Sequence, residues 1–252
     1  MKIFPIKTHK IRPYKENLFR ILDKYLKSCE ERSIVVITSK IAAICEGRVV
    51  KMKTADKKEL IEQEAEYFLP PEENKYNITL TVKGNLLVPT AGIDESNGNG
   101  YYILWPKNPQ KTANEVRKYL CKKFSIKKLG VIITDSKTTP LRWGTTGVGI
   151  AHSGFSALNN YIGKMDIFGR KFKVQKANVL DSLAVSAVLV MGEGSEQTPL
   201  AVIEEIPFVK FQDRNPSEKE LKDFHINMDD DLYGALLKNI KWRKGGKFGK
   251  IN

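Results

Sequence analysis

The feature that most constrains the fold is a set of short apolar runs that alternate with segments of helical periodicity. Three of the runs are Ile34–Ile37, Gly130–Ile133 and Leu200–Ile203. Short apolar runs rich in β-branched residues are typical of buried strands. Because segments with helical spacing lie between them, we predict an α+β fold in which helices pack on mixed or antiparallel sheets.

Helices are predicted where apolar residues recur at helical spacing, and further strands where polar and apolar residues alternate. The segments 16–27, 41–45, 57–68, 112–124 and 179–191 are predicted to be helices. A hairpin is predicted over 79–88 and a strand over 101–104. The stretch 138–154 is rich in Thr and Gly, so it is not expected to be regular throughout.

Length and cysteine content bound the class of protein. A chain of 252 residues is long enough for one large domain or for two closely packed lobes. The three cysteines, Cys29, Cys45 and Cys121, form no CxxC pair, and only three histidines accompany them, so we expect reduced thiols and no zinc cage. No apolar run approaches the roughly 20 residues of a membrane span, and we expect a soluble, cytoplasmic protein with no membrane partner.

The net charge of +13 favours anionic partners such as nucleotides, polycarboxylate cofactors or nucleic acid. From Lys238 onward the chain holds six basic residues and no acidic one. We interpret residues 238–252 as a flexible, solubilising basic tail. Nucleic-acid binding through this tail stays open as the less favoured alternative.

Three polar clusters follow predicted strands or helices and are the candidate sites of chemistry. They are Asp94 to Asn97, Asp135 with Ser136, and Gly192 to Ser195. Carboxylates in such loops are available to a hard divalent cation, which prefers oxygen ligands. A single Asp in a loop is more often a turn residue or helix cap, so each cluster alone is a weak signal.

Several common catalytic motifs are missing. No Gly-Lys-Ser or Gly-Lys-Thr occurs, which argues against a P-loop. The segment from Gly147 to His152 begins like a dinucleotide fingerprint but lacks the third glycine. His152 is interpreted as a structural group and Cys45 as a small buried hydrophobe, since no catalytic context surrounds either.

Six segments, in order along the chain, carry a resemblance to a known family. This resemblance joins the three polar clusters in a single hypothesis about the site. They are IKTHKI, VVITSKIAAICEGRVV, PTAGIDESN, LGVIITDSKTTPLRWGTTGVGIAHSGF, MDIFGRKFKV and DSLAVSAVLVMGEGSEQTPLAVI. Together they resemble the coenzyme F-420 gamma-glutamyl ligase family, and still more its bacterial group described as putative folate-metabolism gamma-glutamate ligases. The resemblance implies a ligase domain over 3–205, followed by a packed extension over 206–237.

The resemblance also implies roles for individual residues. Asp94 and Asp135 are expected to hold one divalent metal ion and to be catalytic, while Ser136 and Glu193 lie near a second. GTP, or alternatively ATP, is the expected co-substrate, with magnesium or manganese and a possible potassium ion. The residues expected to contact the nucleotide are Lys7, Thr8, His9, Lys10, Thr38, Ser39, Asn97, Met191, Gly192, Gly194, Ser195 and Thr198.

The expected reaction joins L-glutamate to a carboxylate of a cofactor-like acceptor, either F-420-like or folate-like, in an intertwined homodimer. That carboxylate must be activated first, and the terminal phosphate of a nucleotide can activate it as an acyl phosphate. Arg142, as a catalytic residue, and Lys137 are candidate cationic partners of a phosphate or carboxylate. Trp105 and Trp143 are candidates for stacking on an aromatic acceptor, although core packing is the favoured interpretation of both.

The chain departs from the family pattern at three places. Ile44 stands where archaeal enzymes usually have a lysine, Lys137-Thr138-Thr139 replaces Phe-Gly-Arg, and Glu193 replaces a glutamine. The first two departures motivate a second hypothesis, a catalytically inactive homologue that binds the nucleotide or cofactor on the same scaffold.

Overall fold

The computed structural model describes residues 1–246 and is organised around a five-stranded sheet. Its strand order is β1 (Lys2–Ile6), β12 (Leu200–Glu204), β2 (Ile34–Thr38), β8 (Gly130–Thr138) and β9 (Thr145–Ser153). The β2–β8 pair is parallel, whereas the other neighbouring pairs are antiparallel. The predicted α+β class with mixed sheets is therefore confirmed.

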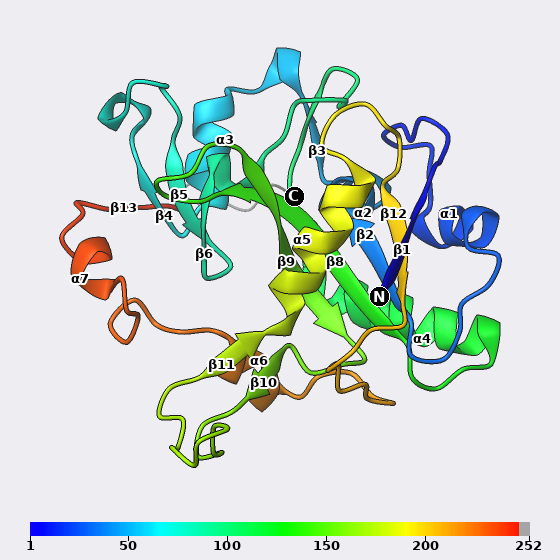
Figure 1. The fold of residues 1–252 in the computed structure, drawn as a ribbon. Coiled ribbons are helices and arrows are strands. Elements are labelled where there is room, and N and C mark those ends of the chain that lie inside the picture. The colour runs from blue at the N-terminus through cyan, green and yellow to red at the C-terminus, as the bar shows by residue number, and fades with distance from the viewer. Residues whose placement is uncertain (247–252) are drawn as a thin grey trace.

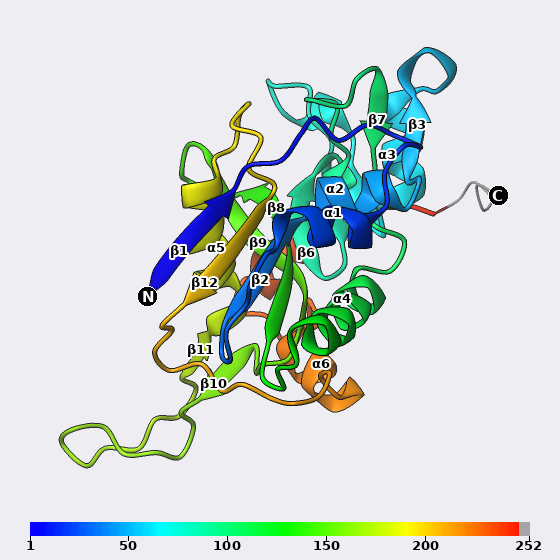
Figure 2. The same cartoon turned by 90° about the vertical axis from the view of Figure 1, so that its right-hand side faces the viewer.

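Helices cover both faces of this sheet (Figures 1 and 2). One face packs on α1 (Leu18–Tyr25), α2 (Ser39–Cys45) and α4 (Pro109–Phe124), and the other on α5 (Val179–Met191). Along β2, Val35 and Ile37 contact the first group, while Ile34 and Val36 contact the α5 side. Burial of both faces explains why this strand is apolar without alternation.

Strand β9 was not predicted, because its many glycines suggested irregular structure. The structure shows that the glycines serve helix packing instead. A Cβ atom at Gly147 would lie 2.6 Å from the carbonyl oxygen of Ala184, and one at Gly149 would lie 2.4 Å from Cγ of Leu180. Helix α5 can therefore lie close against β9, and only the turn between β8 and β9 is irregular.

A smaller lobe lies beside the main sheet. Its four-stranded sheet has the order β13 (Arg243–Lys244), β4 (Tyr67–Leu69), β5 (Leu80–Lys83) and β6 (Leu86–Pro89). Helix α3 (Lys57–Glu64), the two-stranded sheet of β3 (Val49–Lys51) and β7 (Tyr101–Ile103), and the 3-10 turns Met52–Thr54, Pro71–Glu73 and Thr90–Gly92 complete it.

The helix predicted over 57–68 is too long. It ends at Glu64, and Tyr67–Leu69 instead forms strand β4, which pairs with β5. Aromatic residues favour strands, and Phe68 packs into the apolar cluster of the small lobe with Leu60 and Ile93.

The segment after residue 205 packs on the main sheet and its connections. Gln212 donates a backbone hydrogen bond to Gly154 at 2.8 Å, and the extension forms α6 (Glu218–Phe224) and α7 (Gly234–Leu237). Within the predicted basic tail, Arg243 and Lys244 pair with β4, whereas residues 247–252 lie outside the described residues.

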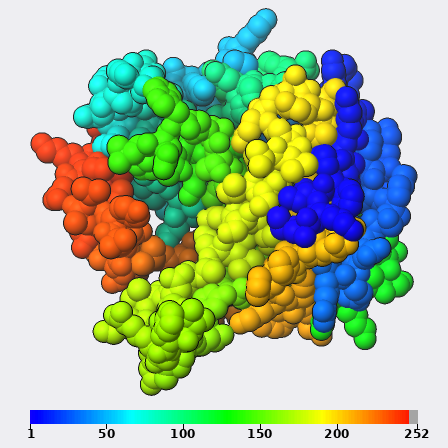
Figure 3. Space-filling view, viewed as in Figure 1, coloured from blue at the N-terminus to red at the C-terminus, as the bar shows by residue number. Residues whose placement is uncertain are grey.

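A long excursion between β10 (Leu158–Asn160) and β11 (Lys176–Asn178) projects from the body of the molecule (Figures 2 and 3). We call residues 161–175 the arm. Among the described residues, no helix combines the length and apolar character needed to cross a bilayer.

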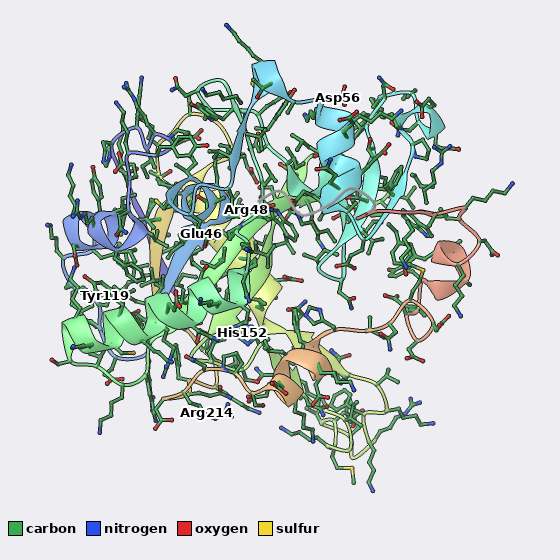
Figure 4. The ribbon with its side chains drawn as sticks, turned by 180° about the vertical axis from the view of Figure 1, so that it is seen from behind. Glu46, Arg48, Asp56, Tyr119, His152 and Arg214 are labelled. Atoms are coloured by element: carbon green, nitrogen blue, oxygen red, sulfur yellow. The ribbon has the colours of Figure 1, made fainter. Side chains whose placement is uncertain are left out.

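His152 on β9 is a buried ionisable group, only 2% exposed, beside α4 and α6 (Figure 4). Its ring lies against Phe155 and Phe224, with centroids 5.3 and 6.3 Å away. Burial lowers the pKa of His152 from 6.5 to about 4, because the charged imidazolium would lose its hydration.

We predict that this histidine destabilises the fold in acid. Between pH 6.5 and 4 the unfolded chain binds a proton at His152 that the folded chain does not, so stability falls as the pH falls through this window. The change contributes on the order of 3 kcal/mol at most. Urea unfolding at several pH values gives the unfolding free energy as a function of pH. This free energy should fall less steeply with falling pH in His152→Gln than in the wild type, and an equal pH dependence would refute the prediction.

Candidate functional site

A cavity of ≈ 960 Å³ lies at the carboxyl end of β2, beside residues Thr134 to Ser136 of the parallel strand β8. Residues from the segments 8–12, 38–44, 89–99, 134–145 and 188–199 line it. Ligands of open sheets commonly bind beyond the carboxyl ends of parallel strands, where the chain leaves the sheet in loops. This cavity is therefore the candidate functional site.

The cavity brings together most of the residues predicted from the sequence. Those that line it are Thr8, His9, Lys10, Thr38, Ser39, Asp94, Asn97, Asp135, Ser136, Met191, Gly192, Glu193, Gly194, Ser195 and Thr198. Lys7 and Arg142 are exposed and are not among the lining residues. Arg142 belongs to the turn between β8 and β9.

Asp135 lies within β8, not after its end as predicted, because this strand continues to Thr138. A register shift between Ile133 and Thr134 precedes it. Since Thr38 pairs with Thr134, Ser39 comes to lie beside Asp135, and its side chain is one of the hydrogen-bonding partners of the carboxylate. The indole nitrogen of Trp105 donates a hydrogen bond to Oδ2 of Asp135.

The pKa of Asp135 is raised to about 6, because loss of water around the carboxylate outweighs its hydrogen bonds to Ser136, Trp105 and Ser39. The negative charge of Asp94 adds to this rise. Asp135 is therefore a carboxylate whose ionised form a bound cation would stabilise.

The pKa of Asp94 is shifted in the opposite direction from that of Asp135. Lys40 Nζ lies 2.6 Å from its Oδ2, and the backbone N–H of Ser96 donates to its Oδ1 at 2.7 Å. Burial acts to raise the pKa of Asp94, but Lys40 and Ser96 outweigh it and hold that pKa below its usual value. Its backbone is fixed by two hydrogen bonds to Ile103, of 2.9 and 2.7 Å.

The loop from Gly192 to Pro199 forms one wall of the cavity and is tied to three other segments. Asn97 donates to the carbonyl of Gly194 at 3.0 Å, and Ser136 donates to both carboxylate oxygens of Glu193 at 2.9 and 2.8 Å. The backbone N–H of Thr8 donates to Gln197 at 2.9 Å. Segments far apart in sequence thus share one hydrogen-bonded rim.

His9 anchors the N-terminal part of the rim. Its Nδ1 lies 2.7 Å from the hydroxyl of Tyr25, and its Nε2 lies 2.8 Å from Oε1 of Glu16. Both ring nitrogens therefore have partners on or next to α1, which fixes the segment that carries Lys10 into the cavity wall.

The donor set fits a hard divalent cation with few protein ligands. Asp94 and Asp135 offer carboxylate oxygens, and Ser39 and Ser136 offer hydroxyls on the same cavity wall. The described residues contain no group of three or more His, Cys, Asp or Glu side chains arranged for a metal ion. Two carboxylates suit magnesium, which retains waters and takes phosphate oxygens in its other positions.

Sequence reasoning missed Lys40 as a site residue, although it directly follows Thr38 and Ser39. Its ammonium group bonds Asp94 and also donates to the carbonyl and hydroxyl of Ser96, each at 3.2 Å. A lysine beside two predicted nucleotide contacts was the signal available. Ile44, the departure from the family lysine, lines the cavity while packing with Val49 and Ile103.

The two tryptophans differ from each other. Trp105 is 4% exposed, as core packing predicts, but it also bonds Asp135. The core prediction for Trp143 is wrong, because its ring is 89% exposed at the tip of the β8–β9 hairpin and contacts only the edge of Tyr76 among the aromatic residues described.

Comparison with known proteins identifies the family of this chain. The model of the F420-0:Gamma-glutamyl ligase family matches residues 5–205. The chain is 34% identical to the coenzyme F420:L-glutamate ligase of Methanococcus maripaludis strain C6, over 75% of this chain and 82% of the relative. It is 32% identical to the enzyme of the same name from Methanocaldococcus jannaschii, over 81% and 89% of the two chains.

Gly92 yields a prediction about how this site is built. It has φ +69, and a Cβ atom there would lie 2.0 Å from Nε1 of Trp105, the atom that bonds Asp135. Gly100 has φ +85 but open space around it. We expect Gly92→Ala to lose about 1–3 kcal/mol more unfolding free energy than Gly100→Ala, because only the first displaces the indole. Equal losses in urea titrations would contradict this.

Proposed function

Because this chain belongs to the F420-0:gamma-glutamyl ligase family, we propose that it joins L-glutamate to a carboxylate of a cofactor-like acceptor through a gamma-glutamyl amide bond. The observation that carries the proposal is the meeting of Asp94, Asp135 and the Gly192–Pro199 loop around one cavity. GTP is the proposed co-substrate, with ATP as the alternative.

Amide formation from a free carboxylate is uphill in water, so the proposed reaction has two steps. An acceptor carboxylate oxygen attacks the terminal phosphorus of the nucleotide, the bond to the bridging oxygen breaks, and nucleoside diphosphate leaves. The amine of glutamate then attacks the acyl phosphate carbonyl, loses a proton and displaces inorganic phosphate. Positioning and charge stabilisation dominate catalysis of phosphoryl transfer.

The nucleotide is proposed to lie along the rim formed by the Gly192–Pro199 loop. Gly192, Gly194 and Ser195 are exposed there. The amides of Gly192 and Gly194 are bonded to Val188 and Glu196, so the amide of Ser195 and the loop carbonyls are the proposed backbone contacts, and Lys10 contributes a positive charge. Asn97 is placed to order this loop through its bond to Gly194. Thr38 and Ser39 complete the wall at the end of β2.

Asp94 and Asp135 are proposed to hold one magnesium or manganese ion, with Ser136 and Glu193 near a second and potassium as a possible further ion. Bound metal would offset phosphate charge and align the reacting oxygen with phosphorus. Ser39 and Trp105 orient Asp135, and Lys40 orients Asp94. Lys40 also supplies a positive charge beside the phosphates once Asp94 engages a metal.

The acceptor is proposed to be an F420-type carboxylate, as the names of the relatives indicate, with a folate-like acceptor as the alternative. The exposed Arg142 and the half-buried Lys137 lie on the β8–β9 hairpin beyond Asp135, and either is suited to an acceptor carboxylate. The three thiols are free, which fits the proposed cytoplasmic location.

We predict that Asp94→Asn and Asp135→Asn each lower nucleotide-dependent incorporation of labelled glutamate by at least about 1,000-fold, because each removes a charge at the reacting phosphate. Asp213→Asn, an exposed aspartate of the extension, should retain wild-type incorporation. Mass spectrometry of the product formed with an F420-type or a folate-like acceptor identifies the substrate. Wild-type rates in either site variant would defeat the assignment.

The alternative hypothesis, a catalytically inactive homologue, is distinguished from an active ligase by phosphate release. It would show a higher melting temperature with GTP and magnesium together but would release no phosphate with glutamate and either acceptor. Nucleic-acid binding, the third hypothesis, requires affinity that falls steeply with salt and is lost when residues after Lys238 are deleted.

We also propose a homodimer in which the arm contacts a second copy. The arm exposes Ile162, Met165, Ile167, Phe168 and Val174, of which Ile167 and Phe168 are 91% and 89% exposed. Helix α5 exposes a further apolar residue, Leu189, at 82%. The arm that carries these residues projects from the body of the molecule (Figure 3). Apolar side chains exposed together in this way are typical of a protein contact.

Sedimentation velocity tests this assembly. We expect the wild type to sediment as a dimer and the double variant Ile167→Lys, Phe168→Glu as a monomer, because charges would enter the apolar contact. Leu232→Glu is the control, since Leu232 is equally exposed, at 88%, but lies on the C-terminal extension. A wild-type monomer, or a double variant that stays dimeric, would refute the proposed contact.

A further inference from the structure

Three charged side chains form a largely buried cluster against Trp105. Glu64 accepts from Arg48 Nη2 through Oε1 and from Lys83 Nζ through Oε2, each at 2.7 Å. The side chains of Arg48, Glu64 and Lys83 are only 24%, 15% and 13% exposed. None of the three is among the residues that line the cavity.

The cluster holds Trp105 from two directions. Nε of Arg48 donates to the carbonyl oxygen of Trp105 at 3.1 Å, and Nζ of Lys83 lies 5.2 Å from the centroid of its ring. Gly84 and Gly92 leave the space that the indole occupies. The N–H of the same indole ring donates a hydrogen bond to Oδ2 of Asp135.

The members come from separate elements of the small lobe. Arg48 lies between α2 and β3 (Figure 4), Glu64 ends α3, Lys83 ends β5 and Trp105 follows β7. Asp135 belongs to the main sheet. The contacts therefore connect the packing of the small lobe to one carboxylate of the site.

Stability alone is a weak reason for this cluster. Burying ion pairs removes charges from water, and apolar side chains of similar volume often serve stability as well or better. Two cations and one anion leave a net positive charge next to Trp105. Burial lowers the pKa of Lys83, while the charges of Glu64 and Asp135 oppose that shift. The ammonium group of Lys83 therefore interacts electrostatically with the Asp135 carboxylate.

We propose that Arg48, Glu64 and Lys83 are positioning residues that hold Trp105 so that its N–H fixes the orientation of the Asp135 carboxylate toward the metal. This inference rests on the proposed function, in which Asp135 is a metal ligand. Outer partners of a metal ligand typically change metal affinity or activity by about 10–100-fold when they are removed.

The first test measures Mn²⁺ binding directly, by electron paramagnetic resonance of free Mn²⁺ with GDP present. Trp105→Phe keeps the apolar ring but removes the N–H, so we expect the dissociation constant for Mn²⁺ to rise about 10-fold or more. Trp143→Phe, the exposed tryptophan, is the matched control and should bind Mn²⁺ like the wild type. Unchanged affinity in Trp105→Phe would overturn the proposal.

The second test addresses the charged cluster without touching the indole. Lys83→Met should weaken Mn²⁺ binding and lower kcat about 10-fold while the KM for glutamate stays within twofold. Lys83→Arg, which keeps the charge over the ring, should restore both values. A role in folding alone predicts lower thermal stability with unchanged Mn²⁺ affinity in the folded protein, and that result would reject the positioning role.

The two levels of proposal fail differently. A wild-type protein that binds no Mn²⁺ with GDP and incorporates no glutamate defeats the proposed function. A wild type that binds Mn²⁺, together with Trp105→Phe and Lys83→Met variants of equal affinity, defeats only the positioning role. If Trp105→Phe does not fold, the Lys83 pair of variants decides the question alone.

Discussion

The parallel pairing of β2 with β8 is the interaction on which the site depends. The Thr38–Thr134 register brings the end of β2 beside the middle of β8, so Ser39 reaches Asp135. Strand β12 on the other side of β2 delivers the preceding loop to the same edge, where Thr38 donates to Pro199 at 3.0 Å. Apolar packing on both faces of these strands fixes the register, because a slip by one residue would exchange the two faces.

The two site carboxylates are held in contrasting environments. Asp94 is neutralised by Lys40 and lies on a loop tied to β7, whereas Asp135 is surrounded by neutral donors and by Asp94 itself. Both carboxylates line the same cavity. Of the two carboxylates, only Asp135 lacks a directly bonded cationic side chain. A cation bound between the Asp94 loop and β8 would offset the desolvation of the Asp135 carboxylate and its repulsion from Asp94.

Strong local patterns made much of the main sheet predictable. The helix at Val179–Met191 and the strands after Ile34, Gly130 and Leu200 follow from apolar runs that tertiary contacts reinforce. Strand β9 did not, since Gly147 and Gly149 are there to admit α5, and that reason lies in another element. Likewise, the sequence around Phe68 fits the end of an amphipathic helix. Only the pairing of β4 with β5 shows that Phe68 lies in a strand.

The site was predictable to a different degree. Resemblance to a family supplied many of the residues that line the cavity, together with Lys7 and Arg142, which do not line it. It supplied neither Lys40 as the partner of Asp94 nor the link from Trp105 to Asp135. Such contacts join residues 30 or more positions apart, and no periodicity encodes them.

The position of Trp105 explains why a ligase site of this kind would need the small lobe. Asp135 sits in a sheet that is complete without that lobe, yet its carboxylate takes a hydrogen bond from a residue that only the small lobe positions. Asp94 reaches the cavity from the same lobe, through its pairing with Ile103. Relative movement of the two lobes would therefore change the separation of the two carboxylates. The hydrogen bond from Trp105 to Asp135 crosses between the lobes and opposes such movement, and the charges around Trp105 fix its position within the small lobe.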